Sequence, residues 1–322
     1  RAAIFLFGLV IFGQGNKSVG TIVAISSYAS YFWQPIMNLG NIFNNFINNI
    51  AYLERIFETM DEPVTVKDAK DAVEMPKIRG EVTFDHVNFS YDASKQILND
   101  VSFTVKPGES VALVGPTGAG KSTIVNLISR FYNVNGGRVL IDGQDISQVT
   151  IHSLREQMGI MMQDSFIFSG DIEDNIRYGK LDATHEEIVK ASRTVCADEF
   201  ISKMPDRYQT EVRERGSMLS QGQKQLISFA RTLLSDPAIL ILDEATSSID
   251  TQTEIQVQQG IESLLKGRTS FIIAHRLSTI KNADRIFVID HGKIFEQGTH
   301  DELMAKQGAY YQLYQAQFRR VS

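Results

Sequence analysis

Eight residues near the middle of the chain combine glycines, a lysine and a hydroxyl at a spacing suited to holding phosphate. They read GPTGAGKS over residues 115–122, between the apolar run 111–114 and a helical pattern that begins near Ser122. Glycines let backbone N–H groups approach phosphate oxygens, and a helix N-terminus adds positive potential. We expect Lys121 to reach the β- and γ-phosphates of a nucleotide and Ser122 to ligate Mg²⁺. The predicted nucleotide contacts here are Gly115, Thr117, Gly118, Ala119, Gly120, Lys121, Ser122 and Thr123.

Four further polar residues lie at or near the ends of apolar runs. Asp243 and Glu244 follow residues 239–242, His275 follows 271–274, and Gln163 follows 158–162. A carboxylate at the end of such a strand can orient Mg²⁺ through water beside a phosphate loop, and we expect this of Asp243. The alternatives are structural: a carboxylate that caps a turn, a strand-end histidine and a solvated loop glutamine.

Residues 219–223 read LSQGQ and precede the acidic strand, and they resemble the signature sequence of ATP-binding cassette (ABC) proteins. The other motifs occur in that family's order from Tyr91 to His275. The resemblance implies that Glu244 polarises the attacking water and that His275 contacts the γ-phosphate. It implies that Gln163 contacts Mg²⁺ and the water, and that Tyr91 stacks on adenine, although a core tyrosine is the alternative.

The same resemblance implies that two cassettes close head to tail over two ATP molecules. The signature residues Ser220, Gln221, Gly222 and Gln223 would then serve the partner's nucleotide, and Ser248 and Asp250 would touch the opposing cassette. Gln221 stands where the family usually has glycine, while Glu244 is retained, which favours a heterodimer of two half-transporters over a homodimer. Arg213 also departs from the usual glycine, within an exporter-specific segment at 211–216 that contacts coupling helices.

The first 60 residues are similar to the end of the membrane domain of multidrug- or lipid-type ABC exporters. We expect a partial helix over 1–13 and a last membrane helix over about 19–56, whose residues 19–39 approach the roughly 20 needed to cross a bilayer. Its C-terminal half would project into the cytosol. Gln34 and the asparagines that follow would face a bundle interior, a cavity or the cytosol. An amphipathic soluble helix packed on the cassette is the alternative.

The remaining chain predicts an α/β fold: a phosphate-loop ABC cassette with a mixed sheet core, an antiparallel β subdomain and an inserted helical subdomain over about 164–234. Expected strands are 82–89, 101–105, 111–114, 138–141, 239–242, 270–274 and 285–289, and a helix should follow the capping box Thr299-x-x-Glu302. A polar linker at 61–79 precedes the cassette at 80–322. Because the chain begins at Arg1 inside an apolar stretch, we expect it to be a fragment of a longer protein.

Composition narrows the class of protein. The 322 residues carry a net charge of −6, which argues against a nucleic-acid-binding face. The single cysteine allows no internal disulfide. We expect a multi-pass protein of the cell membrane with its cassette in the cytoplasm, using ATP and Mg²⁺ and contacting lipid. It would export a drug, lipid or peptide. A soluble ABC ATPase or a regulatory nucleotide-binding module is the alternative, although such proteins give the apolar first 40 residues no role.

Overall fold

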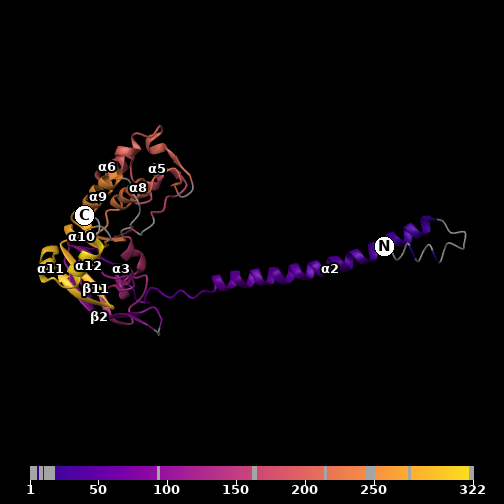
Figure 1. Ribbon diagram of the computed structural model, residues 1–322, viewed down its shortest axis with the longest axis horizontal. Helices are drawn as coiled ribbons and strands as arrows, with labels where there is room; N and C mark the ends of the chain where they lie inside the picture. The colour runs from indigo at the N-terminus through magenta and orange to yellow at the C-terminus, as the bar shows by residue number, and fades with distance from the viewer. Residues whose placement is uncertain are drawn as a thin grey trace. The chain divides into compact units, whose positions relative to one another are not determined.

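The computed structural model describes residues 6, 10, 19–92, 95–161, 165–213, 216–243, 251–274 and 277–318. Its contacts divide the chain into two units, residues 1–64 and residues 65–322. The first unit contains the long helix α2, and the second contains every strand of the described residues (Figure 1).

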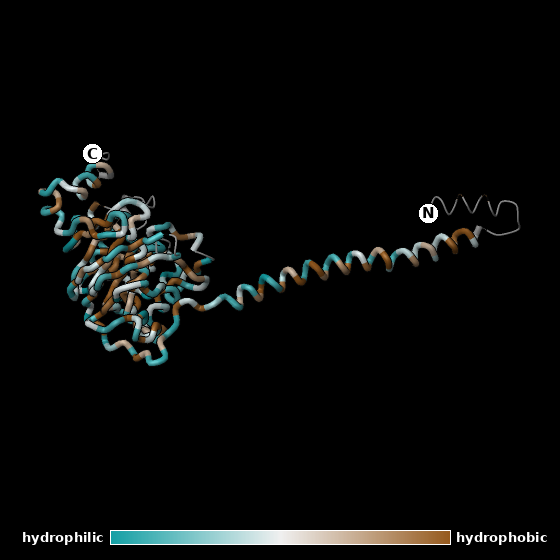
Figure 2. The backbone as a smooth tube through the Cα atoms, turned by 90° about the horizontal axis from the view of Figure 1, so that it is seen from below, coloured by the Kyte–Doolittle hydropathy of each residue, from teal (hydrophilic) through white to brown (hydrophobic). Residues whose placement is uncertain are grey.

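Helix α2 (Val19–Met60) runs for 42 residues with Pro35 inside it. Apolar and polar stretches alternate along it (Figure 2). Within the described residues, no helix is both long enough and apolar enough to cross a membrane. The helix expected over 19–56 lies within α2, and its place in a membrane domain stays a prediction.

The second unit is built on a six-stranded mixed sheet in the order β12-β11-β3-β10-β9-β6. Neighbouring strands from β11 to β6 are parallel, and β12 joins the edge antiparallel. The strands are β3 (Ser110–Val114), β6 (Met158–Met161), β9 (Ile239–Asp243), β10 (Thr269–Ile273), β11 (Arg285–Asp290) and β12 (Lys293–Gly298). Four of these were expected from apolar runs with the same centres, whereas β6 and β12 were not.

A four-stranded antiparallel sheet lies beside it, in the order β2-β1-β4-β5. Its strands are β1 (Val82–Ser90), β2 (Gln96–Val105), β4 (Gly136–Ile141) and β5 (Gln144–Asp145). This is the predicted antiparallel part. The 3₁₀ turn η1 (Ile146–Gln148) and helix α4 (Ile151–Arg155) then lead the chain to β6.

The stretch between β6 and β9 is mainly helical, as expected. It contains α5 (Ile172–Arg177), α6 (His185–Thr194), α7 (Asp198–Ile201), the 3₁₀ turn η2 (Arg207–Gln209) and α8 (Gln221–Leu234). The short strands β7 (Gly170–Asp171) and β8 (Glu211–Val212) pair within it. Helices α5, α6 and α8 lie together with α9 (Thr251–Leu265) at one end of the cassette (Figure 1).

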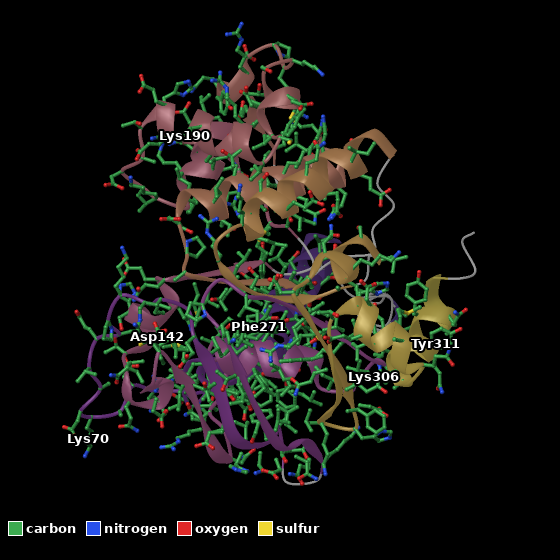
Figure 3. All side chains as sticks on the ribbon, turned by 90° about the vertical axis from the view of Figure 1, so that its left-hand side faces the viewer. Lys70, Asp142, Lys190, Phe271, Lys306 and Tyr311 are labelled. Carbon is green, nitrogen blue, oxygen red and sulfur yellow. The ribbon has the colours of Figure 1, made fainter. Side chains whose placement is uncertain are left out.

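The mixed sheet separates two apolar cores because its side chains alternate between faces. On β3, Val111 and Leu113 enter the core shared with the antiparallel sheet and α3 (Lys121–Ile128), whereas Ala112 and Val114 enter the core shared with the helices. Phe271 of β10, fully buried, lies in the middle of the unit (Figure 3). The sheet is therefore covered on both faces, as parallel strands require.

Helix α10 (Leu277–Asn282) connects β10 to β11, and α11 (His300–Lys306) and α12 (Ala309–Phe318) follow β12. The capping box predicted at Thr299 is present: its hydroxyl accepts from the Glu302 N–H, and the Glu302 carboxylate accepts from the Thr299 N–H. This reciprocal pairing fixes where α11 begins.

Candidate nucleotide-binding site

The phosphate loop connects β3 to α3, as the sequence predicts. Gly115, Gly118 and Gly120 adopt φ angles of +148°, +79° and +112°, which residues with side chains rarely adopt. A β-carbon on Gly115 would also lie 2.1 Å from the carbonyl oxygen of Ile289. Gly120 is the N-cap of α3 and leaves the helix end without a side-chain cap. The loop therefore presents backbone N–H groups at a helix N-terminus, as phosphate binding requires.

Lys121 lies across this loop. Its ammonium donates to the carbonyl oxygens of Gly115 and Pro116 at 2.8 and 2.9 Å. Burial lowers the pKa of Lys121, and the negative charge of Asp243 acts in the opposite sense. The ammonium is thus a half-buried donor held among acceptors that a phosphate oxygen can replace.

Ser122 and Asp243 supply the oxygen atoms suited to Mg²⁺. Ser122 is exposed in the first turn of α3, and Asp243 is the last residue of β9. Groups of three or more His, Cys, Asp or Glu that could hold a metal are absent from the described residues. A single hydroxyl with one carboxylate still fits Mg²⁺, because this ion keeps several waters and takes other ligands from phosphate.

Tyr91 lies beside the phosphate loop within a cluster of rings. Its hydroxyl is 3.2 Å from the hydroxyl of Thr123 in α3. Its ring meets those of Phe89 and Tyr132 edge to face at 4.8 and 4.9 Å. Tyr91 remains 48% exposed, so it is not the core tyrosine of the alternative reading. An aromatic surface therefore lies near the site of the phosphates, where a base can stack.

The signature residues begin α8 through a second capping box. The Ser220 hydroxyl accepts from the Gln223 N–H at 3.2 Å, and the Gln223 side-chain oxygen accepts from the Ser220 N–H at 2.9 Å. The spacing S-x-x-Q indicates this capping role, which was not among the roles predicted for Ser220 and Gln223. Ser220 is exposed, whereas Gly222 is buried. Among the described residues, no hydrogen bond joins residues 220–223 to residues 115–123.

Five predicted site residues fall outside the described residues: Gln163, Glu244, Ser248, Asp250 and His275. The strands that precede three of them are nevertheless described. β6, β9 and β10 lie in that order, parallel to one another and to β3, which ends at the phosphate loop. Because parallel strands end at the same edge of a sheet, the chain leaves all four strands on the side where the phosphate loop lies.

Comparison with known proteins agrees with the resemblance to ABC proteins that the sequence motifs indicate. The family model described as "ABC transporter" matches residues 98–247. The chain carries the ATP-binding domain of an ABC transporter. It is 52% identical over 317 residues to the uncharacterized ABC transporter ATP-binding protein YknV of Bacillus subtilis, covering 98% of this chain and 52% of that protein.

Two further relatives have more informative names. The fatty acid ABC transporter ATP-binding/permease protein of Mycobacterium bovis is 45% identical over 314 residues, covering 98% of this chain and 49% of the relative. The structure of a bacterial Atm1-family ABC exporter with ATP bound matches with a TM-score of 0.76 and 40% identity. That match covers 100% of this ABC chain and 56% of the exporter chain. The chain thus spans about half the length of the curated relatives it matches.

Proposed function

We propose that the chain is the ATP-binding and ATP-hydrolysing part of an ABC exporter. The observation that carries this proposal is the shared edge of the sheet, where the phosphate loop, Asp243 and the segments leading to Gln163, Glu244 and His275 all follow parallel strands. The similarity to an exporter whose structure holds ATP supports the choice of nucleotide.

In this function the phosphate loop binds the nucleotide through its N–H groups, and Lys121 exchanges its loop carbonyls for phosphate oxygens. Tyr91 stacks on the base. Ser122 and Asp243, the latter through water, hold Mg²⁺ together with Gln163. When bound, that ion neutralises charge developing on the phosphates.

Hydrolysis requires a base beside the attacking water, and we assign that role to Glu244. It directly follows Asp243, the last residue of β9, and β9 ends at the same edge of the sheet as β3 and the phosphate loop. A carboxylate within hydrogen-bond reach of the water can accept its proton as the bond to phosphorus forms. His275 contacts the γ-phosphate, and Gln163 contacts the same water.

The signature completes the site of a second chain. Ser220 and Gln223 use each other as capping partners, which fixes where α8 begins, and Ser220 is exposed there. Such a helix N-terminus favours an anion, and a γ-phosphate presented by a partner supplies one. Ser248 and Asp250 contact the opposing cassette. ATP therefore holds the two cassettes together, and hydrolysis releases them.

The partner in this proposal is a different half-transporter. Gln221 is the first residue of α8 and the centre of the signature, where the family usually has glycine, while this chain keeps Glu244. The signature of such a chain completes a less active ATP site on its partner, while the catalytic glutamate remains in the chain's own ATP site. Full basal ATPase activity from the full-length form of this chain alone would contradict the heterodimer and support a homodimer.

The helical part of the cassette offers a surface for the membrane domain of the exporter. Phe166 and Tyr178 are 54% and 55% exposed, and Phe168 stacks on Tyr178 at 4.4 Å. Nearby in sequence to the signature, Glu211, Arg213, Ser217 and Met218 line a depression of about 440 Å³. Exposed aromatic clusters of this kind mark docking sites.

We place the full-length protein in the cell membrane as a multi-pass exporter, with its cassettes in the cytoplasm.

The transported molecule is a drug, lipid or peptide. Relatives named for fatty acid transport and for multidrug export both match this chain at 45–48% identity, so similarity at this level favours no single substrate.

The experiment that tests this function replaces Glu244 with glutamine in the full-length protein. Glutamine keeps the size of the side chain but cannot accept the proton. We expect ATP to bind and to stabilise the closed dimer while turnover falls by at least about 100-fold. Undiminished turnover would show that Glu244 is not the base. Recovery of the full-length protein in the cytosolic fraction would instead support a soluble ABC ATPase.

A further inference from the structure

The first residues of the cassette unit are bound along its surface. We call residues 67–81 the leading segment, because they connect the cassette to the chain that continues into α2. Val73 pairs with Val149 in a parallel bridge, and the Thr150 N–H donates to the Val73 carbonyl at 2.8 Å. Met75 and Ile78 are buried. The predicted polar linker is therefore a docked element over most of its length.

Side chains of the cassette hold the leading segment at both ends. Asp142 accepts hydrogen bonds from the N–H groups of residues 79–81. Gln157 accepts from the Ile78 N–H at 2.8 Å, and Ser153 accepts from the Met75 N–H at 2.8 Å. Figure 3 shows Lys70 and Asp142 on the same flank of the cassette, opposite Lys306 and Tyr311. The N-terminal end is held differently, by a buried cation.

That cation is Arg130, whose side chain is only 2% exposed. Its Nη2 donates to the Lys67 carbonyl at 3.1 Å, and its Nη1 donates to the Val149 carbonyl. The Asp68 carboxylate lies 3.8 Å from Nη1 and also accepts from the Ile151 N–H at 2.8 Å. One guanidinium thus joins the leading segment to the turn that precedes α4.

The placement of Arg130 is costly. It follows α3 with a φ of +51°, a left-handed conformation that favours glycine. Its charge is buried, and its Nε has no hydrogen-bond partner among the described residues. Burying an ion pair costs desolvation free energy that the attraction between the two charges often does not recover. These costs indicate that Arg130 does more than fill space.

Arg130 stands at the opposite end of α3 from the phosphate loop. Lys121 begins this helix, and Arg130 follows its last turn, so the helix connects the phosphate site to the leading segment. Arg155 at the end of α4 donates to the Ser129 and Arg130 carbonyls, which ties α4 to the same helix end. α4 is followed by β6, whose strand leads toward Gln163.

We propose that Arg130 is a positioning residue that anchors the leading segment to the end of α3. Nucleotide-driven movement of the cassette is then transmitted to α2 through the short stretch of chain between the anchor and the helix. This rests on the ATP cycle proposed above. Without the anchor, the connection that is not held to the cassette extends over residues 61–73. The same movement of the cassette then displaces α2 less. Arg130 touches neither nucleotide nor transported molecule and acts through the chain it holds.

The first test measures amide hydrogen exchange in the 322-residue chain. In Arg130→Met, we expect the amides of Val73, Thr150 and Ile151 to exchange at least about tenfold faster, while those of β10 are unchanged. Arg138→Met is the matched control, because Arg138 is a 60% exposed arginine paired with Asp85 on the neighbouring sheet. Unchanged exchange at Val73 in a folded Arg130→Met protein would overturn the proposal.

A second variant keeps the test decisive if Arg130→Met does not fold. Asp68→Ala changes a side chain that is 44% exposed, so the core is untouched. It removes both the charge facing Arg130 and the acceptor for the Ile151 N–H. We expect faster exchange at Val73 and Ile151 again. Protection equal to that of the unmodified chain would contradict the anchor.

The functional test uses the full-length protein with Cys196 and any cysteine outside these 322 residues replaced by alanine, and with a fluorophore on Thr59→Cys in α2. ATP should change the fluorescence, and Arg130→Met should reduce that change at least about fivefold without altering ATP affinity. A change of full size in Arg130→Met would overturn the proposal. If ATP fails to bind even with Arg130 intact, the proposed function fails instead, so the two failures are distinguishable.

Discussion

Lys121 donates a hydrogen bond of 2.8 Å to the carbonyl oxygen of Gly115, the first residue of its own phosphate loop. The lysine is therefore prepositioned over the loop by contacts that a phosphate oxygen can replace. This arrangement offsets part of the cost of a half-buried ammonium, whose pKa is lowered by burial. Nucleotide binding must exchange one set of acceptors for another.

Replacing Lys121 with methionine should remove that exchange. Hydrogen bonds to charged groups contribute about 1.5–3 kcal/mol, so we expect ATP affinity to fall by about 10- to 150-fold. The thermal midpoint should stay the same or rise, because a desolvated charge is removed. Isothermal calorimetry and thermal unfolding measure the two quantities. Lys203→Met is the control, since Lys203 is exposed on the helical part. Unchanged affinity in Lys121→Met would contradict the assigned role.

Two glycines of the phosphate loop should respond differently to alanine. At Gly115 a β-carbon would meet the Ile289 carbonyl oxygen at 2.1 Å, which is backbone and cannot move aside. At Gly118 a β-carbon meets nothing within 4 Å, so only the left-handed φ of +79° is unfavourable. We expect Gly118→Ala to lower the free energy of unfolding by about 1 kcal/mol and Gly115→Ala by at least about 3 kcal/mol. Urea denaturation measures both, and equal losses would be inconsistent with this geometry.

The C-terminal helices should weaken in mild acid through His300. Its Nδ1 lies 2.7 Å from the Tyr310 hydroxyl, and burial lowers the pKa of His300, with Lys281 acting in the same direction. Below the unfolded pKa of about 6.5, the unfolded chain binds more protons than the folded chain. Stability contributed by neutral His300 is therefore complete above that pH and is lost as pH falls toward the folded pKa.

The measurement compares thermal midpoints at pH 7.5 and pH 5.5 for the unmodified chain and for His300→Gln, which does not titrate. We expect His300→Gln to lose less stability on acidification than the unmodified chain. The difference in the free energy of unfolding should be well under about 1 kcal/mol, because the ring is partly exposed. Parallel pH profiles would show that His300 does not contribute.

The parts of the fold that sequence reasoning predicted are those encoded locally. Residues 239–242 are all apolar, and two carboxylates follow them. Composition alone therefore predicts both the buried strand and the place where it ends. The phosphate loop is also predictable from local sequence, because its glycines lie at the positions where the backbone needs a positive φ. The capping box at Thr299 needs only residues three apart.

Elements defined by distant partners were not predictable in this way. The leading segment has a polar composition, and its docking depends on Arg130, Ser153 and Gln157, which lie 63 to 79 residues away in sequence. The contact of Tyr91, which follows β1, with Tyr132, which lies between α3 and β4, likewise joins residues far apart in the sequence. β6 contains a glycine and two methionines, so its apolar pattern is weak, and only its place beside β9 makes it a strand.

The central claim is that Ser220 acts on the nucleotide of a partner chain and not on the nucleotide bound by its own phosphate loop. Ser220→Asp tests it most directly, because aspartate is as good an N-cap as serine and keeps α8 intact, while its charge repels a γ-phosphate.

ATP affinity and ATP hydrolysis should be measured side by side on the full-length protein, together with its partner if it forms a heterodimer. We expect Ser220→Asp to bind ATP with unchanged affinity and to lose ATP-dependent dimerisation, with hydrolysis at the site it completes falling at least about tenfold. Loss of ATP affinity at this chain's own phosphate loop, or hydrolysis at the unmodified rate, would contradict the account.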